Sequence, residues 1–236
     1  MPNNLCGGKA ANGGAGLRSS LSSTWTLPEQ FSSELLRHTT PHRLTAGQTL
    51  FAAGDPGDGC YCLDKGVLKV ILSSPNAAER ILALLPAGSV VGDLSMIDGM
   101  PRSASVTALT DCELRFISRS TFEEVTRRHP EIYGYLLKML ATRLRQTDDT
   151  IAASAFMTMH AKFARALLEV ADCLGKETSS GKTLIPLVNQ RDLAALAGVA
   201  RENANRILAD WERRSLVTRL AHSYEIDRIK LEREAT

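Results

Sequence analysis

The chain has 236 residues, of which 44% are hydrophobic and 23% are charged, the proportions of a soluble globular protein. Its 28 Lys and Arg residues against 26 Asp and Glu residues leave a net charge of only +2, so nucleic-acid binding would need a local basic face. No apolar run reaches the ~18 residues of a membrane helix, and the first residues lack the apolar core of a signal peptide. We therefore expect a cytoplasmic protein with no membrane partner.

The five cysteines are scattered, and only Cys60 and Cys62 lie close together. On a strand, this spacing places both side chains on one face. A zinc or iron–sulfur site would need a second close pair, and an odd number of cysteines argues against a disulfide framework. We expect buried cysteines in a reducing compartment and no bound metal.

The amino-terminal half is predicted to begin with a disordered tail and to continue as a β-rich region. Residues 1–24 are rich in Gly, Ser and Asn and contain no acidic residue. A short apolar pattern over 31–37 predicts a brief helix. From 43 to 117, short runs rich in Val, Ile, Leu, Tyr and Phe alternate with turn residues, which is typical of an antiparallel sandwich or barrel. The predicted strands are 49–51, 60–63, 67–72, 80–85, 104–108 and 113–117.

Two helices are predicted after these strands. Ser120 is followed three residues later by Glu123, a capping-box pattern that predicts a helix start. After Pro130 the longest helical stretch of the chain runs to about residue 154. It carries a heptad-like seam, which predicts pairing with a second copy, although a helix packed on its own barrel would show a similar stripe. The seam consists of Leu137, Leu140, Leu144, Thr147, Ile151 and Ser154.

Residues 158–236 are predicted to form a second, mostly helical unit. A helix over 162–174 and a polar loop over 175–182 precede two helices joined by a turn at Gly198. Asn189 is a suitable N-cap for the first of the two, and the second covers 201–213. The alternating segments 216–220 and 224–226 then predict a β-wing.

The second helix of this pair has one polar face and one apolar face. Arginine can bind guanine with two hydrogen bonds and glutamate can accept one from cytosine, so a docked helix presenting these residues has the chemistry of a major-groove reader. A solvated charged face is the alternative. At about 100° per residue, Arg201, Glu202, Asn205 and Arg206 span about 140°, opposite Ala204, Ile207, Leu208 and Trp211.

A second group of candidate binding residues lies between residues 92 and 104. It is predicted to be a short turn, bounded by Gly and Pro, that carries both Asp93 and Arg102. A guanidinium beside backbone N–H groups suits a phosphate, and a carboxylate can accept hydrogen bonds from a ribose hydroxyl. Taken alone, the two residues could instead form an internal ion pair.

Together, these motifs resemble the cyclic-AMP receptor protein/fumarate-nitrate regulator family over roughly residues 43–230. The barrel motifs that carry the resemblance are Leu50-Phe51-x-x-Gly54-Asp55, Gly66-x-x-Lys69-Val70, Gly92-Asp93-Leu94-Ser95-Met96 and Pro101-Arg102-Ser103-Ala104. The carboxyl-terminal motifs are Arg201-Glu202, Asn205-Arg206 and Trp211-Glu212-Arg213.

The resemblance implies an α+β fold: a cyclic-nucleotide-binding β jelly-roll barrel, a long dimerisation helix and a C-terminal winged helix-turn-helix. The expected domains are a disordered tail (1–24), the cyclic-nucleotide-binding domain (25–130), the dimerisation helix and hinge (131–157) and the DNA-binding domain (158–236). It further implies a homodimeric transcriptional regulator, not an enzyme, that binds cyclic AMP or cyclic GMP and then a palindromic TGTGA-like site on double-stranded DNA. RNA polymerase is an expected partner. The alternative is a regulator of this family whose barrel senses redox or a metabolite instead; the iron–sulfur branch is excluded because the tail has a single cysteine.

The family's roles carry over to individual positions of this chain. Arg102 and Ser103 would hold the cyclic phosphate, Asp93 the ribose 2′-OH, and Gly92 would let the backbone approach, while Thr147 would meet the purine. The full set of ligand-binding candidates is Gly92, Asp93, Leu94, Ser95, Arg102, Ser103, Thr147 and Asp148. The DNA-binding candidates are Gln190, Arg201, Glu202, Asn205 and Arg206.

Four positions depart from the family's usual pattern. Asp93 replaces a glutamate, Ala200 forgoes the usual capping hydroxyl, and Ser215 stands where a glycine often leads into the wing. Asp148 follows Thr147 where the cyclic-AMP receptors commonly place a serine. A carboxylate there only accepts hydrogen bonds and would favour the donors of guanine, which predicts that cyclic GMP binds about as well as cyclic AMP. Alternatively, Asp148 points to solvent or pairs with an arginine such as Arg145.

Overall fold

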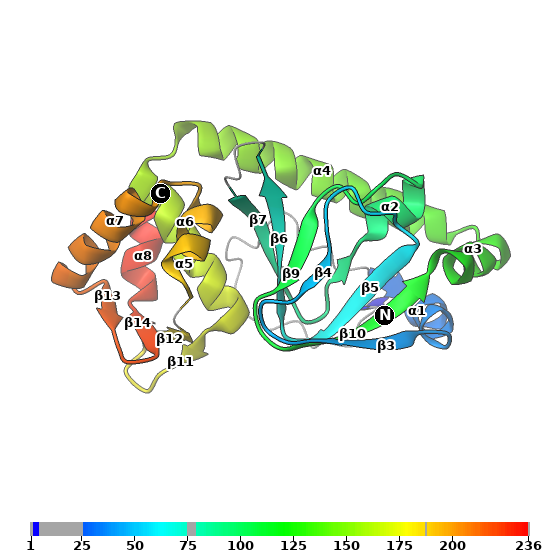
Figure 1. The fold of residues 1–236 in the computed structure, drawn as a ribbon, viewed down its shortest axis with the longest axis horizontal. Coiled ribbons are helices and arrows are strands. Elements are labelled where there is room, and N and C mark those ends of the chain that lie inside the picture. Colours follow the sequence, from blue (N-terminus) through cyan, green and yellow to red (C-terminus); the bar gives the residue numbers. More distant parts are fainter. Residues whose placement is uncertain (1, 5–25, 75–78, 187, 236) are drawn as a thin grey trace. The chain divides into compact units, whose positions relative to one another are not determined.

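The computed structural model describes residues 2–4, 26–74, 79–186 and 188–235 (Figure 1). Within these ranges the chain divides into two compact units. The first contains residues 2–4, 26–72 and 83–148, and the second contains 73–74, 79–82, 149–186 and 188–235. Of the predicted tail, the structure describes residues 2–4, which form strand β1 (Pro2–Asn4) paired antiparallel with β2 (Thr26–Pro28). Most of that prediction lies outside the described residues.

Eight strands form two four-stranded sheets in the strand order of a jelly roll. One sheet has the order β3-β10-β5-β8 and the other β4-β9-β6-β7, so strands far apart in sequence lie side by side (Figure 1). Both the fold class and the six predicted strands are confirmed. The strands are β3 (Thr40–Leu44), β4 (Thr49–Phe51), β5 (Gly59–Lys65), β6 (Val67–Ser73), β7 (Glu79–Pro86), β8 (Val90–Val91), β9 (Ser105–Ala108) and β10 (Cys112–Ser118).

Two of these strands were not predicted, for different reasons. β3 contains Pro41 and buries a single side chain, Leu44, so it shows no apolar alternation. β8 has only two residues, Val90 and Val91, which is too short for any period.

The side chains of β5 confirm the interpretation of the C-x-C spacing. Cys60 and Cys62 are both fully buried in one apolar cluster, while Leu63 enters the other. The first cluster also receives Ile117 from β10. The cysteines are therefore part of the hydrophobic core of the barrel.

Helices cover one end of this core. They are α1 (Glu29–Leu36), which confirms the brief helix, α3 (Arg119–Arg128) and α4 (Ile132–Phe156). The prediction that Ser120 begins α3 was wrong. Ser118 is the N-cap, and its hydroxyl accepts a hydrogen bond from the backbone N–H of Thr121. Ser118 is the last residue of β10 and keeps extended backbone angles, so the change from strand to helix occurs there.

Helix α4 packs on the first unit with one face and leaves three residues of its predicted seam exposed. Ile132 and Leu136 are buried in the barrel's first cluster. Leu137, Leu144 and Ile151 are 67%, 64% and 63% exposed. Leu140 and Thr147 of the seam are half-buried, so Leu137, Leu144 and Ile151 are the seam residues that packing on the barrel does not account for.

The second unit joins helices to a four-stranded sheet with the order β11-β12-β14-β13. The polar loop predicted over 175–182 in fact contains a strand, β11, and the terminal helix α8 was also missed. The elements are α5 (Met159–Leu174), β11 (Lys176–Glu177), β12 (Thr183–Pro186), α6 (Gln190–Ala197), α7 (Arg201–Arg213), β13 (Val217–Arg219), β14 (Ser223–Ile226) and α8 (Arg228–Glu234). The wing predicted from alternation is confirmed as the hairpin of β13 and β14.

Ser215 ends α7 in a left-handed conformation, with φ of +57°. The N–H of Ser215 donates to the carbonyl of Glu212, and the N–H of Leu216 donates to that of Trp211. These are the two hydrogen bonds of a Schellman motif, whose left-handed position usually holds glycine. A serine side chain strains this position, because Cβ is crowded when φ is positive.

Replacing Ser215 with glycine should therefore stabilise the second unit. We expect Ser215→Gly to raise the free energy of unfolding by about 0.5–1 kcal/mol, measured by thermal or denaturant unfolding. Ser120→Gly makes the same chemical change inside helix α3 and should lower the free energy of unfolding, because glycine is unfavourable within a helix. Equal destabilisation by both variants would contradict the strain at Ser215.

Candidate functional site

The segment between β8 and β9 forms a short helix, α2 (Asp93–Asp98), where the sequence predicted a turn. Gly92 precedes the helix with φ of +82°, and Gly99 ends it in the left-handed conformation, its N–H donating to the carbonyl of Ser95. The two glycines make the tight entry and exit possible, since both positions have positive φ. The helix begins with Asp93, which is buried.

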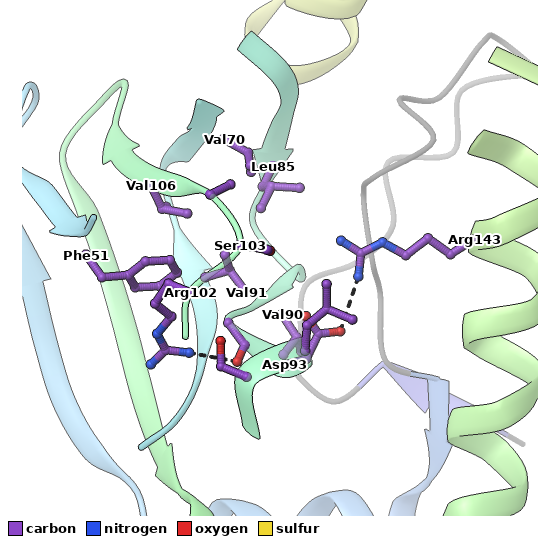
Figure 2. Close-up of a pocket in the computed structure, with 14 residues that line it drawn as sticks. Phe51, Val70, Leu85, Val90, Val91, Asp93, Arg102, Ser103, Val106 and Arg143 are labelled. Atoms are coloured by element: carbon purple, nitrogen blue, oxygen red, sulfur yellow. Dashed lines mark hydrogen bonds and ion pairs between the residues drawn. The ribbon is translucent and has the colours of Figure 1, made fainter. Parts of the chain in front are cut away.

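A cavity lies beside this helix, with about 450 Å³ of empty space that is partly open to solvent. Figure 2 shows its walls, which come from the sheet strands, from α2 and the loop after it, and from α4. The structure brings together there six of the eight predicted ligand residues: Gly92, Asp93, Leu94, Ser95, Arg102 and Ser103. The other lining residues are Phe51, Val70, Leu85, Val90, Val91, Ala104, Val106 and Arg143.

Arg102 is the buried cation of this cavity, with 4% of its surface exposed. Its Nη1 donates to the carbonyls of Gly59 and Gly92, both at 2.8 Å. Its Nη2 lies 3.6 Å from the exposed Asp58 carboxylate, and its buried Nε has no hydrogen-bond partner among the described residues. A buried guanidinium held by two neutral carbonyls and one distant carboxylate has unused capacity for an anion.

Phe51 and Gly92 fix the position of this guanidinium. The Phe51 ring centroid lies 4.4 Å from the Arg102 Cζ atom, which is a cation–π contact (Figure 2). A Cβ atom at position 92 would lie 2.5 Å from Arg102 Nη1. A side chain at position 92 would therefore displace the guanidinium, in addition to the strain of a positive φ. Phe51 belongs to the motif Leu50-Phe51-x-x-Gly54-Asp55, but no pattern in the sequence indicates its contact with Arg102.

Asp93 faces a residue that the sequence reasoning missed. It is 3% exposed, and its Oδ2 lies 3.4 Å from Nη1 of Arg143 on α4 (Figure 2). The pair joins positions fifty residues apart, so no local pattern could reveal it. A signal was nonetheless present: Arg143 precedes Thr147 by four residues, so the two share a face of the helix.

Thr147 and Asp148 do not line the cavity in this structure. The Thr147 side chain is half-buried, and its hydroxyl donates to the carbonyl of Arg143 at 2.9 Å. Asp148 is exposed to solvent. Their contact with a purine stays a prediction.

The two helices of the second unit confirm the predicted helix-turn-helix. Asn189 caps α6, its side-chain oxygen accepting from the N–H groups of Arg191 and Asp192. Gly198 makes the turn with φ of +64°, and Ala200 precedes α7 without a side-chain cap, as expected. Trp211 is fully buried and packs near Phe163 of α5, which holds α7 in place.

The polar face of α7 is free, as the helical period predicted. Arg201, Glu202, Asn205 and Arg206 are exposed, and Ala204, Ile207, Leu208 and Trp211 are buried. Gln190, at the start of α6, is half-buried. The unit thus presents arginine, glutamate and asparagine side chains from the first turns of a docked helix.

Each half of the chain matches a known domain family. Residues 41–129 match the cyclic nucleotide-binding domain, and residues 161–234 match the Crp-like helix-turn-helix domain. The CRP-like cAMP-activated global transcriptional regulator of Mycobacterium tuberculosis is 30% identical over 183 residues, which cover 78% of this chain and 82% of that protein. The chain belongs to the cyclic-AMP receptor protein/fumarate-nitrate regulator family. It is a transcriptional regulator with a cyclic-nucleotide-binding domain and a DNA-binding domain, not an enzyme.

Further relatives agree with this assignment. The cAMP-activated global transcriptional regulator CRP of Salmonella typhimurium is 29% identical over 184 residues, covering 78% of this chain and 87% of that protein. The c-di-GMP-responsive global regulator CLP of Xanthomonas campestris superposes with a TM-score of 0.72 at 22% identity, covering 84% of this chain and 99% of that one. A CRP/FNR family regulator from Thermus thermophilus gives 0.70 at 22% identity, covering 83% and 98%. At these identities the two structures show the shared fold.

Neither a metal cluster nor a membrane helix is found in the described parts of this regulator. Across residues 2–4, 26–74, 79–186 and 188–235, no three His, Cys, Asp or Glu side chains converge on a possible metal. Over the same ranges, no helix combines the length and apolar character needed to cross a bilayer. Burial raises the pKa of the Cys173 thiol to about 12, with Glu169 and Asp172 adding to the shift, so this cysteine stays protonated at neutral pH.

Arg102→Ala should remove most affinity of this regulator for a cyclic nucleotide while leaving the fold intact. The variant removes the buried cation that faces the cavity, a loss of about 2–5 kcal/mol of binding free energy in calorimetry. Arg115→Ala is the matched control, since Arg115 pairs with Asp64 on the same barrel and does not line the cavity. Binding by Arg102→Ala within about threefold of wild type would show that the cavity is not the phosphate site.

Proposed function

We propose that this regulator binds a cyclic purine nucleotide, cyclic AMP or cyclic GMP, in the α2 cavity and then binds a palindromic TGTGA-like DNA site as a homodimer. The observation that carries the proposal is the buried Arg102 guanidinium, which has an N–H without a partner among the described residues and lies in the same cavity as the buried Asp93. A cyclic nucleotide carries the two groups that such a pair recognises, an anionic phosphate and a ribose hydroxyl.

Each end of the ligand has a partner in the cavity. Arg102 would pair with the cyclic phosphate, and Ser103, next in sequence, would add its N–H and hydroxyl. Asp93 would accept a hydrogen bond from the ribose 2′-OH. Because aspartate is one methylene shorter than the family's glutamate, the ribose must come closer to α2 or be bridged by water.

The Asp93–Arg143 ion pair suggests how the ligand acts on α4. A ribose hydroxyl that donates to Asp93 enters the contact that already joins Asp93 to Arg143. Thr147 lies one helical turn beyond Arg143 on the same face, where it would meet the purine. A ligand shifts a two-state equilibrium only when it binds one state better, and contacts shared between α2 and α4 supply such a difference.

The exposed seam of α4 supports the homodimer. Leu137, Leu144 and Ile151 are spaced by seven residues, and each is more than 60% exposed. Apolar residues at this period pair helices in a coiled coil, and two copies of α7 would then read two half-sites related by two-fold symmetry. We place such a regulator in the cytoplasm, with RNA polymerase as its partner.

Binding measurements test the proposal directly. Calorimetry with cyclic AMP and cyclic GMP should give saturable binding, and fluorescence anisotropy with a palindromic TGTGA-containing duplex should show tighter DNA binding when the activating nucleotide is present. DNA binding that is independent of both nucleotides, with no calorimetric signal, would point instead to a barrel that senses redox or a metabolite. The burial of Cys60, Cys62 and Cys112 and the raised pKa of Cys173 do not favour redox sensing by these cysteines.

The purine preference of the site is predicted from Asp148. Cyclic GMP should bind about as well as cyclic AMP, because a carboxylate accepts from guanine N1–H and N2 but repels the N1 acceptor of adenine. Asp148→Ser should therefore lower the affinity for cyclic GMP relative to cyclic AMP. Asp148→Asn introduces a hydrogen-bond donor on a side chain of the same size, so it should also raise the affinity for cyclic AMP relative to cyclic GMP. If both variants kept the wild-type ratio of cyclic GMP affinity to cyclic AMP affinity, Asp148 would not contact the purine and would stay exposed to solvent, as in this structure.

A further inference from the structure

Asn205 lies between the charged residues on the exposed face of α7. At about 100° per residue, it is rotated about 40° from Arg201 and about 60° from Glu202, so it projects between them. It follows Arg201 by four residues and Glu202 by three, which makes it the neighbour of both along the helix surface. Arg206 borders the same face, and all four side chains are exposed.

The amide of Asn205 is available, whereas that of its neighbour is engaged. Asn203 points to the other side of α7, and its Nδ2 donates to the sulfur of Met159 on α5 at 3.3 Å. No such contact of Asn205 is found in the described part of the chain. One turn further, the exposed Ala209 has only a methyl group, which leaves room beside the Asn205 amide.

An asparagine amide has a specific partner among the base edges of the major groove. Its oxygen accepts from adenine N6 and its nitrogen donates to adenine N7, which gives a bidentate contact. Arginine prefers guanine O6 and N7, and glutamate accepts from cytosine N4. Arg201 on one side of Asn205, and Glu202 and Arg206 on the other, therefore select G·C pairs, with an asparagine amide between them.

We propose that Asn205 reads adenine in an A·T pair lying between the G·C pairs contacted by Arg201 and by Glu202 with Arg206. In a TGTGA-like half-site this is the central T·A pair, whose adenine is on the opposite strand. This inference rests on the proposed DNA-binding function and adds a third specificity residue to the charged ones. The charged residues alone leave the base between the two G·C pairs unspecified.

Selection from random DNA tests this assignment without presupposing the site. The full-length wild type, Asn205→Ala and Asn203→Ala are each used with saturating cyclic AMP, with saturating cyclic GMP and without nucleotide. We expect wild type and Asn203→Ala to return the same two-fold symmetric motif, with an A·T pair between two G·C pairs in each half. Asn205→Ala should keep both G·C pairs and lose the preference at the pair between them.

Atom-level substitution in the DNA then separates a direct contact from an effect of DNA shape. Replacing the adenine of that pair with 7-deazaadenine removes the N7 acceptor and keeps base pairing. We expect wild type and Asn203→Ala to bind the modified duplex at least fivefold more weakly, and Asn205→Ala to bind both duplexes equally.

The outcomes distinguish this inference from the function on which it rests. A symmetric wild-type motif that Asn205→Ala leaves unchanged overturns the role of Asn205 while the DNA-binding function stands. An equal loss on 7-deazaadenine for wild type and Asn205→Ala overturns it in the same way. If wild type returns no symmetric motif under any condition, the proposed function fails and the assignment of Asn205 fails with it.

Discussion

The ligand half of the structure depends on one buried charge, the guanidinium of Arg102. Burying an arginine is costly unless hydrogen bonds and an opposite charge compensate. The chain supplies two carbonyls, an aromatic face and the distant, exposed Asp58, and one buried N–H keeps no partner among the described residues. Gly92 is a glycine partly because this guanidinium occupies the space of a Cβ atom. The position of the cation thus constrains the surrounding backbone and leaves the anion to be supplied by a ligand.

The second link is the contact between Asp93 and Arg143. Asp93 is held at the start of α2 by the barrel, and Arg143 is carried by α4. A ligand hydroxyl that donates to the Asp93 carboxylate changes the surroundings of the Asp93–Arg143 ion pair, and Arg143 belongs to α4. This change requires no rearrangement of the barrel core. The side of α4 away from that core carries Leu137, Leu144 and Ile151, which are exposed. In the proposed function, a helix that contacts the nucleotide through one face would pair with a second copy through another, and this would give the nucleotide a physical route to the dimer seam.

How far the sequence predicts the protein depends on the range of the interactions involved. The limits of α7, the N-cap of Asn189 and the turn at Gly198 follow from local rules of period and capping, and all were predicted correctly. Six of the eight barrel strands followed from β-branched runs and turn residues, and β3 and β8 did not. Ser120 was predicted to start α3, whereas Ser118 is the N-cap, because two serines lie near the start of the helix and only the backbone angles distinguish them. α8 was missed because Leu231 is its one buried residue, so the helix shows no apolar period.

The site was predictable in composition and not in its contacts. The resemblance placed Asp93 and Arg102 together, and the cavity contains both. The pairing of Arg143 with Asp93 and the stacking of Phe51 on Arg102 join elements distant in sequence, so no local pattern revealed these contacts. The spacing of Arg143 from Thr147 indicated only that the two share a face of α4. The sequence indicated only that Ser215 stands where the family often has a glycine. The strain at this position follows from its positive φ, which the structure provides.

The proposed function requires allosteric coupling between nucleotide bound in the α2 cavity and DNA, and the reciprocity of the two affinities measures this coupling. The measurement is a calorimetric titration of the activating cyclic nucleotide into the free protein and into its complex with the selected palindromic DNA. The account predicts that DNA tightens nucleotide binding by the same factor by which the nucleotide tightens DNA binding, since coupling free energy is shared by the two sites. Equal nucleotide affinity with and without DNA would contradict it, because a ligand that binds both states equally shifts neither.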